Sequence, residues 1–225
     1  LALKLTELDK NLKILLLGPN SRFGSASAAS GAMLNVFAEI ENNFLDNHHL
    51  TKRFDLGFKA LKIWKKHHQN LEEQSNQKIE IKWGTYVLNS SRGTAFEDRL
   101  FEYLENLFKK KKFKNFSNEL TNPEKIVGLS AQAAHRAIRS IKIEDGIVNS
   151  NELLMAIDKI INQNKNIDVI DSIANKINYS KSQIEVVSNN SKYVTSKIVL
   201  ANGAYAQKLV DGINNLRNNT PRLYF

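Results

Sequence analysis

The stretch KILLLGP, residues 13–19, decides the fold. A short aliphatic run that ends at Gly18-Pro19 is typical of a parallel β-strand buried on both faces. Residues 1–8 come before it, and their leucines predict the end of a buried helix. A helix followed by a buried parallel strand is the second half of a βαβ unit, so the sequence predicts an α/β fold.

A stretch of small residues follows the predicted strand. Residues 21–31 have too few large side chains for a core and are not polar enough for a linker. Small residues let a backbone approach a ligand or another element closely. The stretch taken alone fits a close approach to a ligand or a small-residue helix start packed under a neighbouring element.

The rest of the chain predicts alternating helices and strands. We expect helices over 49–76, 96–108, 150–162 and 205–213, and strands over 78–88, 167–170, 183–187 and 193–200. Asn149 with Glu152 three residues later predicts a capping-box-like start of the third helix. The middle of the chain is less regular than its ends.

The composition excludes several classes of protein. The 225 residues contain no Cys, which rules out disulfides, thiolate–zinc sites and a cysteine nucleophile. The hydrophobic fraction of 42% is enough for a real core, and no run of about 18 apolar residues predicts a membrane span. The first residue is Leu1, so the chain is expected to be a piece of a larger protein.

The formal charge of +9 suggests a nucleic-acid partner, but its distribution weakens that reading. Most of the cations are Lys, and the dense run at residues 109–112 ends a helix pattern, where cations favour the exposed carbonyls. We expect a solvated helix end there and no nucleic-acid partner. A non-catalytic basic module that binds RNA or an acidic surface stays open as an alternative.

Metal and hydrolase sites find little support. His48-His49 and His67-His68 are adjacent pairs, and neighbours on a helix diverge by about 100°, so they do not converge on one metal. No elbow sequence anchors a Ser-His-Asp triad. Glu39 is expected to be a surface or capping carboxylate. The sequence therefore predicts no metal, and it identifies no catalytic residue.

Two segments in this order carry a family resemblance. Residues 13–39 run from the aliphatic strand through the small-residue stretch into Gly-Ala-Met-Leu at 31–34. Residues 145–206 run through a helix, a strand and a hairpin into Ala-Asn-Gly-Ala at 201–204. Together they resemble the flavoprotein family of D-amino-acid oxidase and glycine/sarcosine oxidase.

The resemblance implies an FAD-binding, Rossmann-like domain with a doubly wound parallel sheet and an interleaved α+β substrate domain, truncated at both ends. It divides the chain into a first FAD-binding part at 1–46, a substrate domain at 47–146, a second FAD-binding part at 147–213, and the start of a return to the substrate domain at 214–225. The residues that it implies as flavin contacts are Gly18, Pro19, Ser25, Ala26, Ser27, Ser30, Gly31, Ala32, Met33, Ile173, Ala174, Ala201, Asn202, Gly203 and Ala204. Among these, the hydroxyls of Ser25, Ser27 and Ser30 could donate to phosphate oxygens.

The activity that the resemblance implies is FAD-dependent oxidation of a C–N bond in a small amine or amino acid. Hydride would pass to flavin N5 and leave an imine. Two departures matter: the G-x-G-x-x-G fingerprint is absent and is expected before Leu1, and Gly18-Pro19 stand where an acidic residue usually holds the ribose. The present piece is therefore expected to be inactive by itself.

Three further expectations complete the interpretation. A Rossmann-type enzyme that uses NAD(P) stays open as a second alternative. The absence of a secretory leader in the given sequence favours a cytoplasmic protein. The sequence does not indicate an oligomeric state.

Overall fold

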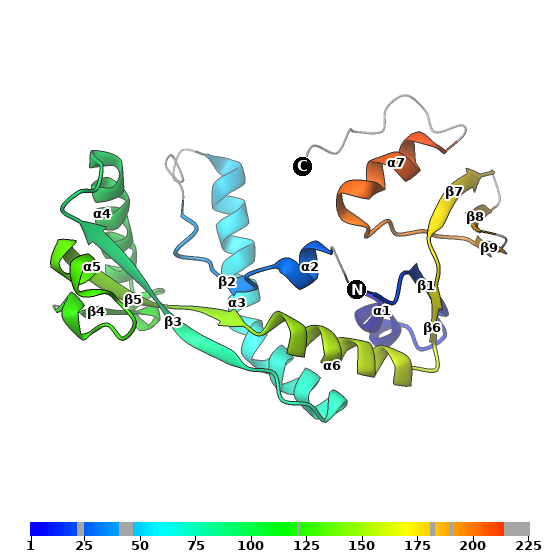
Figure 1. Cartoon of the computed structure of the whole chain (residues 1–225), viewed down its shortest axis with the longest axis horizontal. Helices are drawn as coiled ribbons and strands as arrows, with labels where there is room; N and C mark the ends of the chain where they lie inside the picture. Colours follow the sequence, from blue (N-terminus) through cyan, green and yellow to red (C-terminus); the bar gives the residue numbers. More distant parts are fainter. Residues whose placement is uncertain (22–24, 41–46, 121, 181–182, 190, 214–225) are drawn as a thin grey trace. The chain divides into compact units, whose positions relative to one another are not determined.

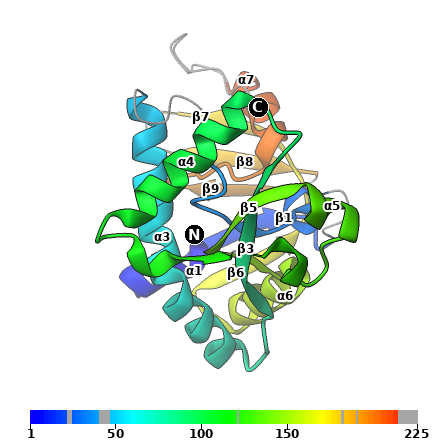
Figure 2. The same cartoon turned by 90° about the vertical axis from the view of Figure 1, so that its left-hand side faces the viewer.

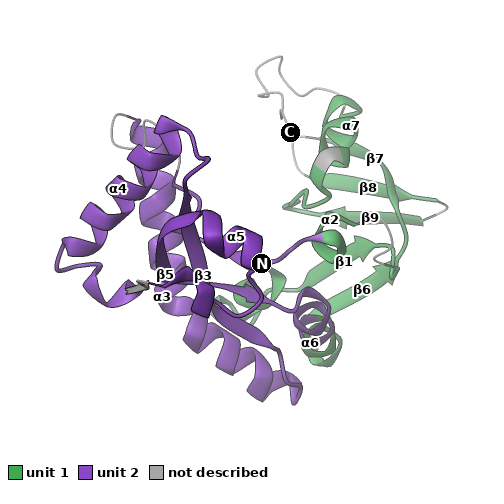
Figure 3. Cartoon of the chain, turned by 60° about the vertical axis from the view of Figure 1, so that its left-hand side comes forward, with its two compact units in different colours: residues 1–29, 158–225 green, residues 30–157 purple. Residues whose placement is uncertain are grey.

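The computed structural model describes residues 1–21, 25–40, 47–120, 122–180, 183–189 and 191–213, and it divides into two units (Figure 3). Unit 1 comprises residues 1–29 and 158–225, and unit 2 comprises residues 30–157. The predicted return to the substrate domain, residues 214–225, lies outside the described residues. Within the described chain, no helix is both long and apolar enough to cross a membrane.

Unit 1 combines a parallel pair of strands with an antiparallel sheet (Figure 1). Its elements are α1 (Ala2–Leu8), β1 (Ile14–Gly18), α2 (Ala26–Ala29), β6 (Ile167–Asp171), β7 (Ala174–Tyr179), β8 (Ile184–Ser188), β9 (Ser191–Thr195), the 3-10 helix η3 (Gly203–Tyr205) and α7 (Ala206–Asp211). β1 pairs with β6 in parallel, from Ile14 opposite Ile167 to Gly18 opposite Asp171. The predicted α/β class with a parallel sheet is confirmed.

Polar contacts hold the beginning of the parallel pair together. Lys13 Nζ donates to Asn166 Oδ1 at 2.7 Å, and Asn164 Nδ2 donates to Thr6 Oγ1 at 3.0 Å. These bonds tie α1 and the start of β1 to the turn that precedes β6. The turn before β6 is thereby fixed relative to the first strand.

Unit 2 is an antiparallel sheet with helices (Figures 1 and 2). Its elements are β2 (Met33–Leu34), α3 (His48–Ser75), β3 (Ile81–Ser90), α4 (Ala95–Lys109), η1 (Lys114–Phe116), β4 (Ser117–Leu120), η2 (Pro123–Lys125), α5 (Ala131–Arg136) and β5 (Ala137–Val148), and it contains the first part of α6 (Ser150–Gln163). β5 lies in the centre and pairs with β2, β3 and β4. Figure 2 shows α3 and α4 on the same side of the β3–β5 ribbon.

Phe37 is the centre of the core of unit 2. Its side chain is 0% exposed, and it lies in the loop that follows β2. Five phenylalanine rings surround it, with ring centroids 5.0–6.0 Å away: Phe54, Phe58, Phe108, Phe113 and Phe116. These rings come from α3, α4 and the η1 region, so the loop after β2 is locked into the same core as both helices.

The predicted helices begin at capping side chains. In α4, Glu97 N–H donates to Thr94 Oγ1 at 3.3 Å, and Thr94 N–H donates to Glu97 Oε2 at 2.6 Å, which completes a capping box. At α6, Asn149 Oδ1 accepts from Glu152 N–H at 3.3 Å as expected. Glu152 Oε2 instead accepts from Glu80 N–H at 2.6 Å, so the carboxylate ties α6 to the residue before β3 rather than returning to the cap.

Three sequence-based expectations are wrong in detail. α1 is not a buried helix, because Leu1 and Leu8 are each 76% exposed and Thr6 is its buried residue. β1 is half-buried rather than buried on both faces, with Leu15 39% exposed. The last strand ends at Thr195 rather than at residue 200. Thr195 Oγ1 donates to Lys197 O at 2.9 Å, and this bond turns the chain after the strand.

Candidate functional site

The carboxyl ends of β1 and β6 form the first part of the candidate site, in unit 1. Parallel pairing places Gly18 opposite Asp171, so both strands end at the same edge. Asp171 Oδ1 accepts from Asn20 N–H at 3.0 Å and fixes the turn that follows Gly18-Pro19. Ligands of open α/β sheets bind at this edge. Asp171 places a carboxylate there although β1 itself ends without one.

Two glycines of unit 1 leave room beside the backbone. No heavy atom of the described chain lies within 4 Å of the position that a Cβ would take at Gly18 or at Gly203. Gly203 has φ +57°, which by itself favours glycine, whereas Gly18 does not have a left-handed backbone. Neither conformation nor crowding within the described chain therefore requires glycine at position 18.

The predicted serine contact at α2 has a structural partner as well. Ser25 Oγ accepts from Ala28 N–H at 3.2 Å and caps this short helix, which includes Ala26 and Ser27. A hydroxyl that accepts a backbone N–H can still donate its own hydrogen. The capping bond is therefore compatible with the predicted donation to an anion.

The predicted adenine-side residues begin β7. Ile173 is 60% exposed, and its carbonyl oxygen accepts from the buried Ser188 Oγ at 2.7 Å. Ala174 is the first residue of β7 and pairs with Ser188. The turn at residues 201–204 leads through η3 into α7, which contacts β7. The segment at residues 173–174 and the turn at residues 201–204 are therefore joined to two elements, β7 and α7, that contact each other.

The remaining predicted contacts, Ser30 to Met33, lie in unit 2 and enter β2. Met33 pairs with Ile147 and Leu34 pairs with Gly146, while Val148 N–H donates to Ala32 O at 3.1 Å. A Cβ at Gly31 would meet only Met33 Cγ, at 3.9 Å, among the described atoms. Met33 is 62% exposed. This segment is thus fixed on one side by β5 and open on the other.

Ala32 has a strained backbone. Its φ is +45°, in the left-handed region that residues with a Cβ rarely adopt. Such a conformation costs about 1–3 kcal/mol and persists only where the surroundings enforce it. The bond from Val148 N–H to Ala32 O is one enforcing contact. Strain of this kind is common where a backbone is shaped to meet a ligand.

A buried carboxylate that the sequence did not indicate lies beside this segment. Asp145 is 0% exposed, and its Oδ2 accepts from Phe37 N–H at 3.0 Å and Ala38 N–H at 2.9 Å. Within the described chain, its Oδ1 has no hydrogen-bond partner. Burial raises the pKa of Asp145, the N–H groups of Ala38, Val36 and Phe37 lower it, and the charge of Glu39 raises it.

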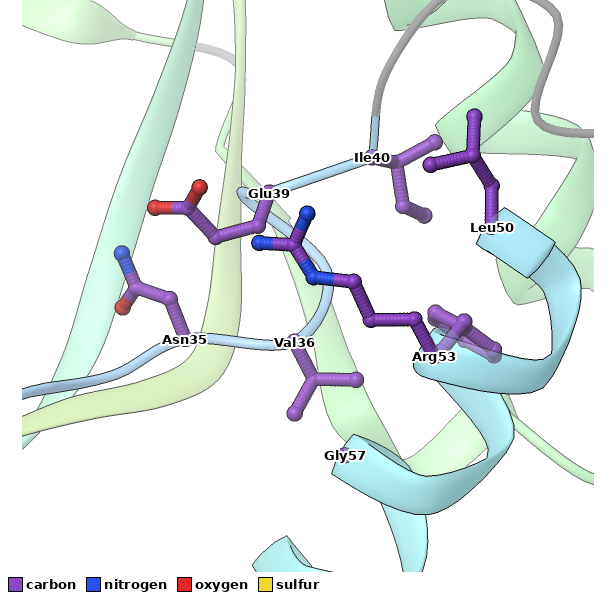
Figure 4. A pocket seen from close by; sticks show the side chains of 8 residues that line it. Asn35, Val36, Glu39, Ile40, Leu50, Arg53 and Gly57 are labelled. Atoms are coloured by element: carbon purple, nitrogen blue, oxygen red, sulfur yellow. The ribbon is translucent and has the colours of Figure 1, made fainter. Parts of the chain in front are cut away.

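A small cavity opens beside the loop that Asp145 holds (Figure 4). Its volume is about 110 Å³, and it is lined by Asn35, Val36, Glu39, Ile40, Leu50, Arg53, Phe54 and Gly57. Figure 4 shows the Arg53 side chain extending from α3 toward Glu39 and Asn35 on the loop. Both the loop and α3 belong to unit 2, and Asn35, which lines the cavity, donates its Nδ2 N–H to Met33 Sδ at 3.5 Å.

Metal chemistry has no obvious place in the described part of the chain. There, no group of three His, Asp or Glu side chains is arranged to hold a metal ion. The donors that the candidate site does offer are backbone groups, serine hydroxyls and the carboxylate of Asp171. This donor set suits the phosphates and hydroxyls of a nucleotide.

Comparisons with known proteins identify the fold. Glycine oxidase from Geobacillus kaustophilus matches 88% of this chain with a TM-score of 0.68 at 15% identity, over 50% of its own length. Iminodiacetate oxidase from Chelativorans sp. BNC1 matches 93% of this chain with a TM-score of 0.69 at 14% identity, over 53% of its own length. L-α-glycerophosphate oxidase from Mycoplasma pneumoniae, solved with FAD bound, matches 88% with a TM-score of 0.62 at 16% identity, over 50% of its length.

The fold is therefore that of these oxidases, and the chain spans about half the length of each. No protein-family model and no curated protein matches the sequence. The fold-level expectation from the resemblance is confirmed by these structures. The roles of individual residues stay predictions.

Sequence reasoning missed Asp145, Asp171 and the strain at Ala32. Asp145 contacts Phe37, 108 positions away, and no local pattern reports such a contact. The end of β6 was predicted, so the pairing of parallel strand ends could have pointed to Asp171. The conformation of Ala32 has no sequence signal, because alanine rarely adopts a positive φ and its presence does not predict one.

Proposed function

We propose that this chain forms part of an FAD-dependent oxidoreductase that oxidises a C–N bond of a small amine or amino acid. Unit 1 and, separately, residues 30–33 of unit 2 would each supply contacts to the cofactor, and the sheet of unit 2 would belong to the substrate domain. The fold shared with glycine oxidase and iminodiacetate oxidase supports this assignment. The sequence resemblance supports it independently at residues 13–39 and 145–206.

One observation carries the proposal: Gly18 and Gly31 are glycines that the chain itself does not need. Neither has a left-handed backbone, and a Cβ at either would meet no described atom closer than 3.9 Å. Both lie in the segments that resemble the flavin-binding segments of the family. A ligand that passes close to the backbone explains why these positions are free of side chains.

Different residues of the chain would contact different parts of the cofactor. The backbone at Gly18 and Gly31 and the hydroxyls of Ser25, Ser27 and Ser30 would face the pyrophosphate. Asp171 would take the ribose hydroxyls that an acid at the end of β1 usually holds. When bound, FAD supplies a hydride acceptor. The protein's part is to orient the substrate and to exclude water.

The proposed substrate class is a small amine or amino acid. The C–N bond follows from the substrates that the names of glycine oxidase and iminodiacetate oxidase state for those proteins. Glycerophosphate oxidase has the same fold, and its name states a phosphorylated alcohol as its substrate. Glycerophosphate is therefore the negative-control substrate in an activity assay. Turnover of amines but not of glycerophosphate is the expected result.

The cofactor proposal can be tested at Gly31. A Gly31→Val variant of the protein expressed from its complete reading frame should stay folded, because the chain leaves room there, and should lose bound FAD. Gly212→Val is a matched control, because Gly212 lies outside the candidate site. A Cβ at Gly212 would also make only ordinary van der Waals contacts, at 3.6 Å. FAD content per polypeptide and the melting temperature are the measurements. Wild-type FAD content in Gly31→Val would remove this segment from the site.

A further inference from the structure

We propose that Asp145 is a positioning residue that holds residues 31–38 in the shape the cofactor requires. This inference rests on the proposed function, because it assigns to Asp145 the support of Gly31, Ala32 and Met33. Asp145 itself is buried and would not touch the cofactor. It acts through the backbone of the loop that follows β2.

The attachment of the loop to β5 is continuous. Along β5, Val148 holds Ala32, Ile147 pairs with Met33, and Gly146 pairs with Leu34. β2 ends at Leu34, and the ladder ends with it. The next residue of β5, Asp145, continues the attachment with its side chain, which binds the N–H groups of Phe37 and Ala38.

The close fit of Gly146 fixes where Asp145 can lie. A Cβ at Gly146 would come within 2.8 Å of the Trp83 ring and 3.0 Å of Lys82 O. β5 therefore packs tightly against β3 at this point. The register also shifts between Trp83 and Thr85, opposite residues 143–146 of β5. This irregularity lies where Asp145 reaches the loop, in keeping with the use of β-bulges to redirect side chains.

The acceptor matters to the loop because one of its two donors is fully buried. Phe37 is 0% exposed, whereas Ala38 is an exposed residue. A buried N–H group that loses its acceptor is left unsatisfied, and the chain must move to restore a partner. Phe37 is fixed by five aromatic contacts, so the movement would fall on the residues before it. Those residues include Ala32, whose left-handed backbone depends on enforcement from its surroundings.

Three variants test the proposal in the protein expressed from its complete reading frame. Asp145→Asn keeps an acceptor oxygen of the same shape, and Asp145→Leu removes it. Asn89→Ala is the control for general destabilisation. Asn89 is also a buried polar residue of unit 2, 2% exposed, and its Nδ2 donates to Asp98 Oδ1 at 2.7 Å, near the opposite end of the sheet.

The measurements are FAD affinity and amide hydrogen exchange. Asp145→Leu should weaken FAD binding at least about tenfold and speed exchange in residues 30–40 by a similar factor, since the loss of the acceptor leaves the buried Phe37 N–H unpaired. Asp145→Asn should stay within about threefold of wild type on both measures. Asn89→Ala should speed exchange around residues 85–98 and leave FAD affinity unchanged.

Each outcome decides a different point. Unchanged FAD affinity in Asp145→Leu, with FAD bound to wild type, overturns the role of Asp145 alone. The role of Asp145 is also overturned if Asn89→Ala lowers the affinity for FAD as much as Asp145→Leu does, because the effect is then general destabilisation. A wild-type protein that binds no FAD overturns the proposed function as well. If Asp145→Leu fails to fold, Asp145→Asn must retain both FAD and exchange protection, or the proposal is wrong.

Discussion

The two units present opposite solutions at the residues proposed to hold the cofactor. In unit 2, the loop after β2 enters a closed aromatic core in which Phe37 is 0% exposed. In unit 1, the parallel strands carry aliphatic side chains that stay partly open, with Leu15 39% and Val169 43% exposed. The positions of the proposed contact residues in unit 2 thus depend on the packing of the buried core. The positions of those in unit 1 depend on the ends of the strands β1 and β6.

This difference predicts where substitutions act on stability and where they act on binding. Core residues that shape a site indirectly are costly to change, because large-to-small substitutions leave cavities. Strand-end residues beside open space can change with little effect on folding.

The largest expected effect is at Phe37. Phe37→Ala should lower the free energy of unfolding by about 3–5 kcal/mol, because a fully buried ring inside an aromatic cluster is lost. Leu15→Ala in unit 1 should cost about 1 kcal/mol, because that side chain is already partly exposed. Urea unfolding followed by circular dichroism measures both. Equal losses would contradict the contrast between the units.

A smaller contrast is expected at two glycines. Gly146→Ala should cost about 1–3 kcal/mol, because its Cβ would come within 2.8 Å of the Trp83 ring and force a shift. Gly18→Ala should change stability by less than about 0.5 kcal/mol, because no described atom lies within 4 Å of the added carbon. Melting temperatures of the two variants compare them directly. A destabilised Gly18→Ala would mean that unit 1 is as tightly packed there as unit 2.

The smallest effects concern pH, where the two units should differ in sign. Burial raises the pKa of Asp145, so the folded state keeps a proton that the unfolded state releases. Its contribution to stability is present below the ordinary Asp pKa and is lost as pH rises through the raised value. In unit 1, hydrogen bonds from Asn178 and Lys192 lower the pKa of Glu185. Its contribution is present above the ordinary Glu pKa and is lost as pH falls.

Substitution by Asn or Gln removes the titrating group and isolates its contribution to the pH dependence of the free energy of unfolding. Relative to wild type, Asp145→Asn should gain stability as pH rises from about 4 toward 7. Glu185→Gln should instead gain relative stability as pH falls below about 4. The free energy of unfolding across this pH range is the measurement. Slopes of the same sign in both variants would contradict the assigned causes.

The sequence predicted the elements that have strong local patterns. α3, α4 and α6 have helical periodicity or capping residues, and β1 and β6 are short aliphatic runs, so their existence was correct. β5 was missed although it is central to unit 2. Its sequence, AIRSIKIEDGIV, mixes charged and aliphatic residues because one face packs on the core while Lys142 lies over the Tyr86 ring on the other.

The candidate site divides in the same way. Small-residue segments were visible because their composition is unusual over ten or more positions. The attachment of residues 31–38 to Asp145 was not visible, because it depends on one side chain meeting a loop far away in the sequence. The exposed aliphatic residues of β1 were also unexpected, because the sequence pattern does not report what covers a strand.

The absorbance spectrum of the natively purified protein, expressed from its complete reading frame, tests the central claim most directly. A flavoprotein should show bands at roughly 370 and 450 nm that leave with the cofactor on denaturation. These bands are expected, and the band at roughly 450 nm should bleach when a small amine or amino acid is added without oxygen. A colourless protein that also fails to bind added FAD would contradict the central claim.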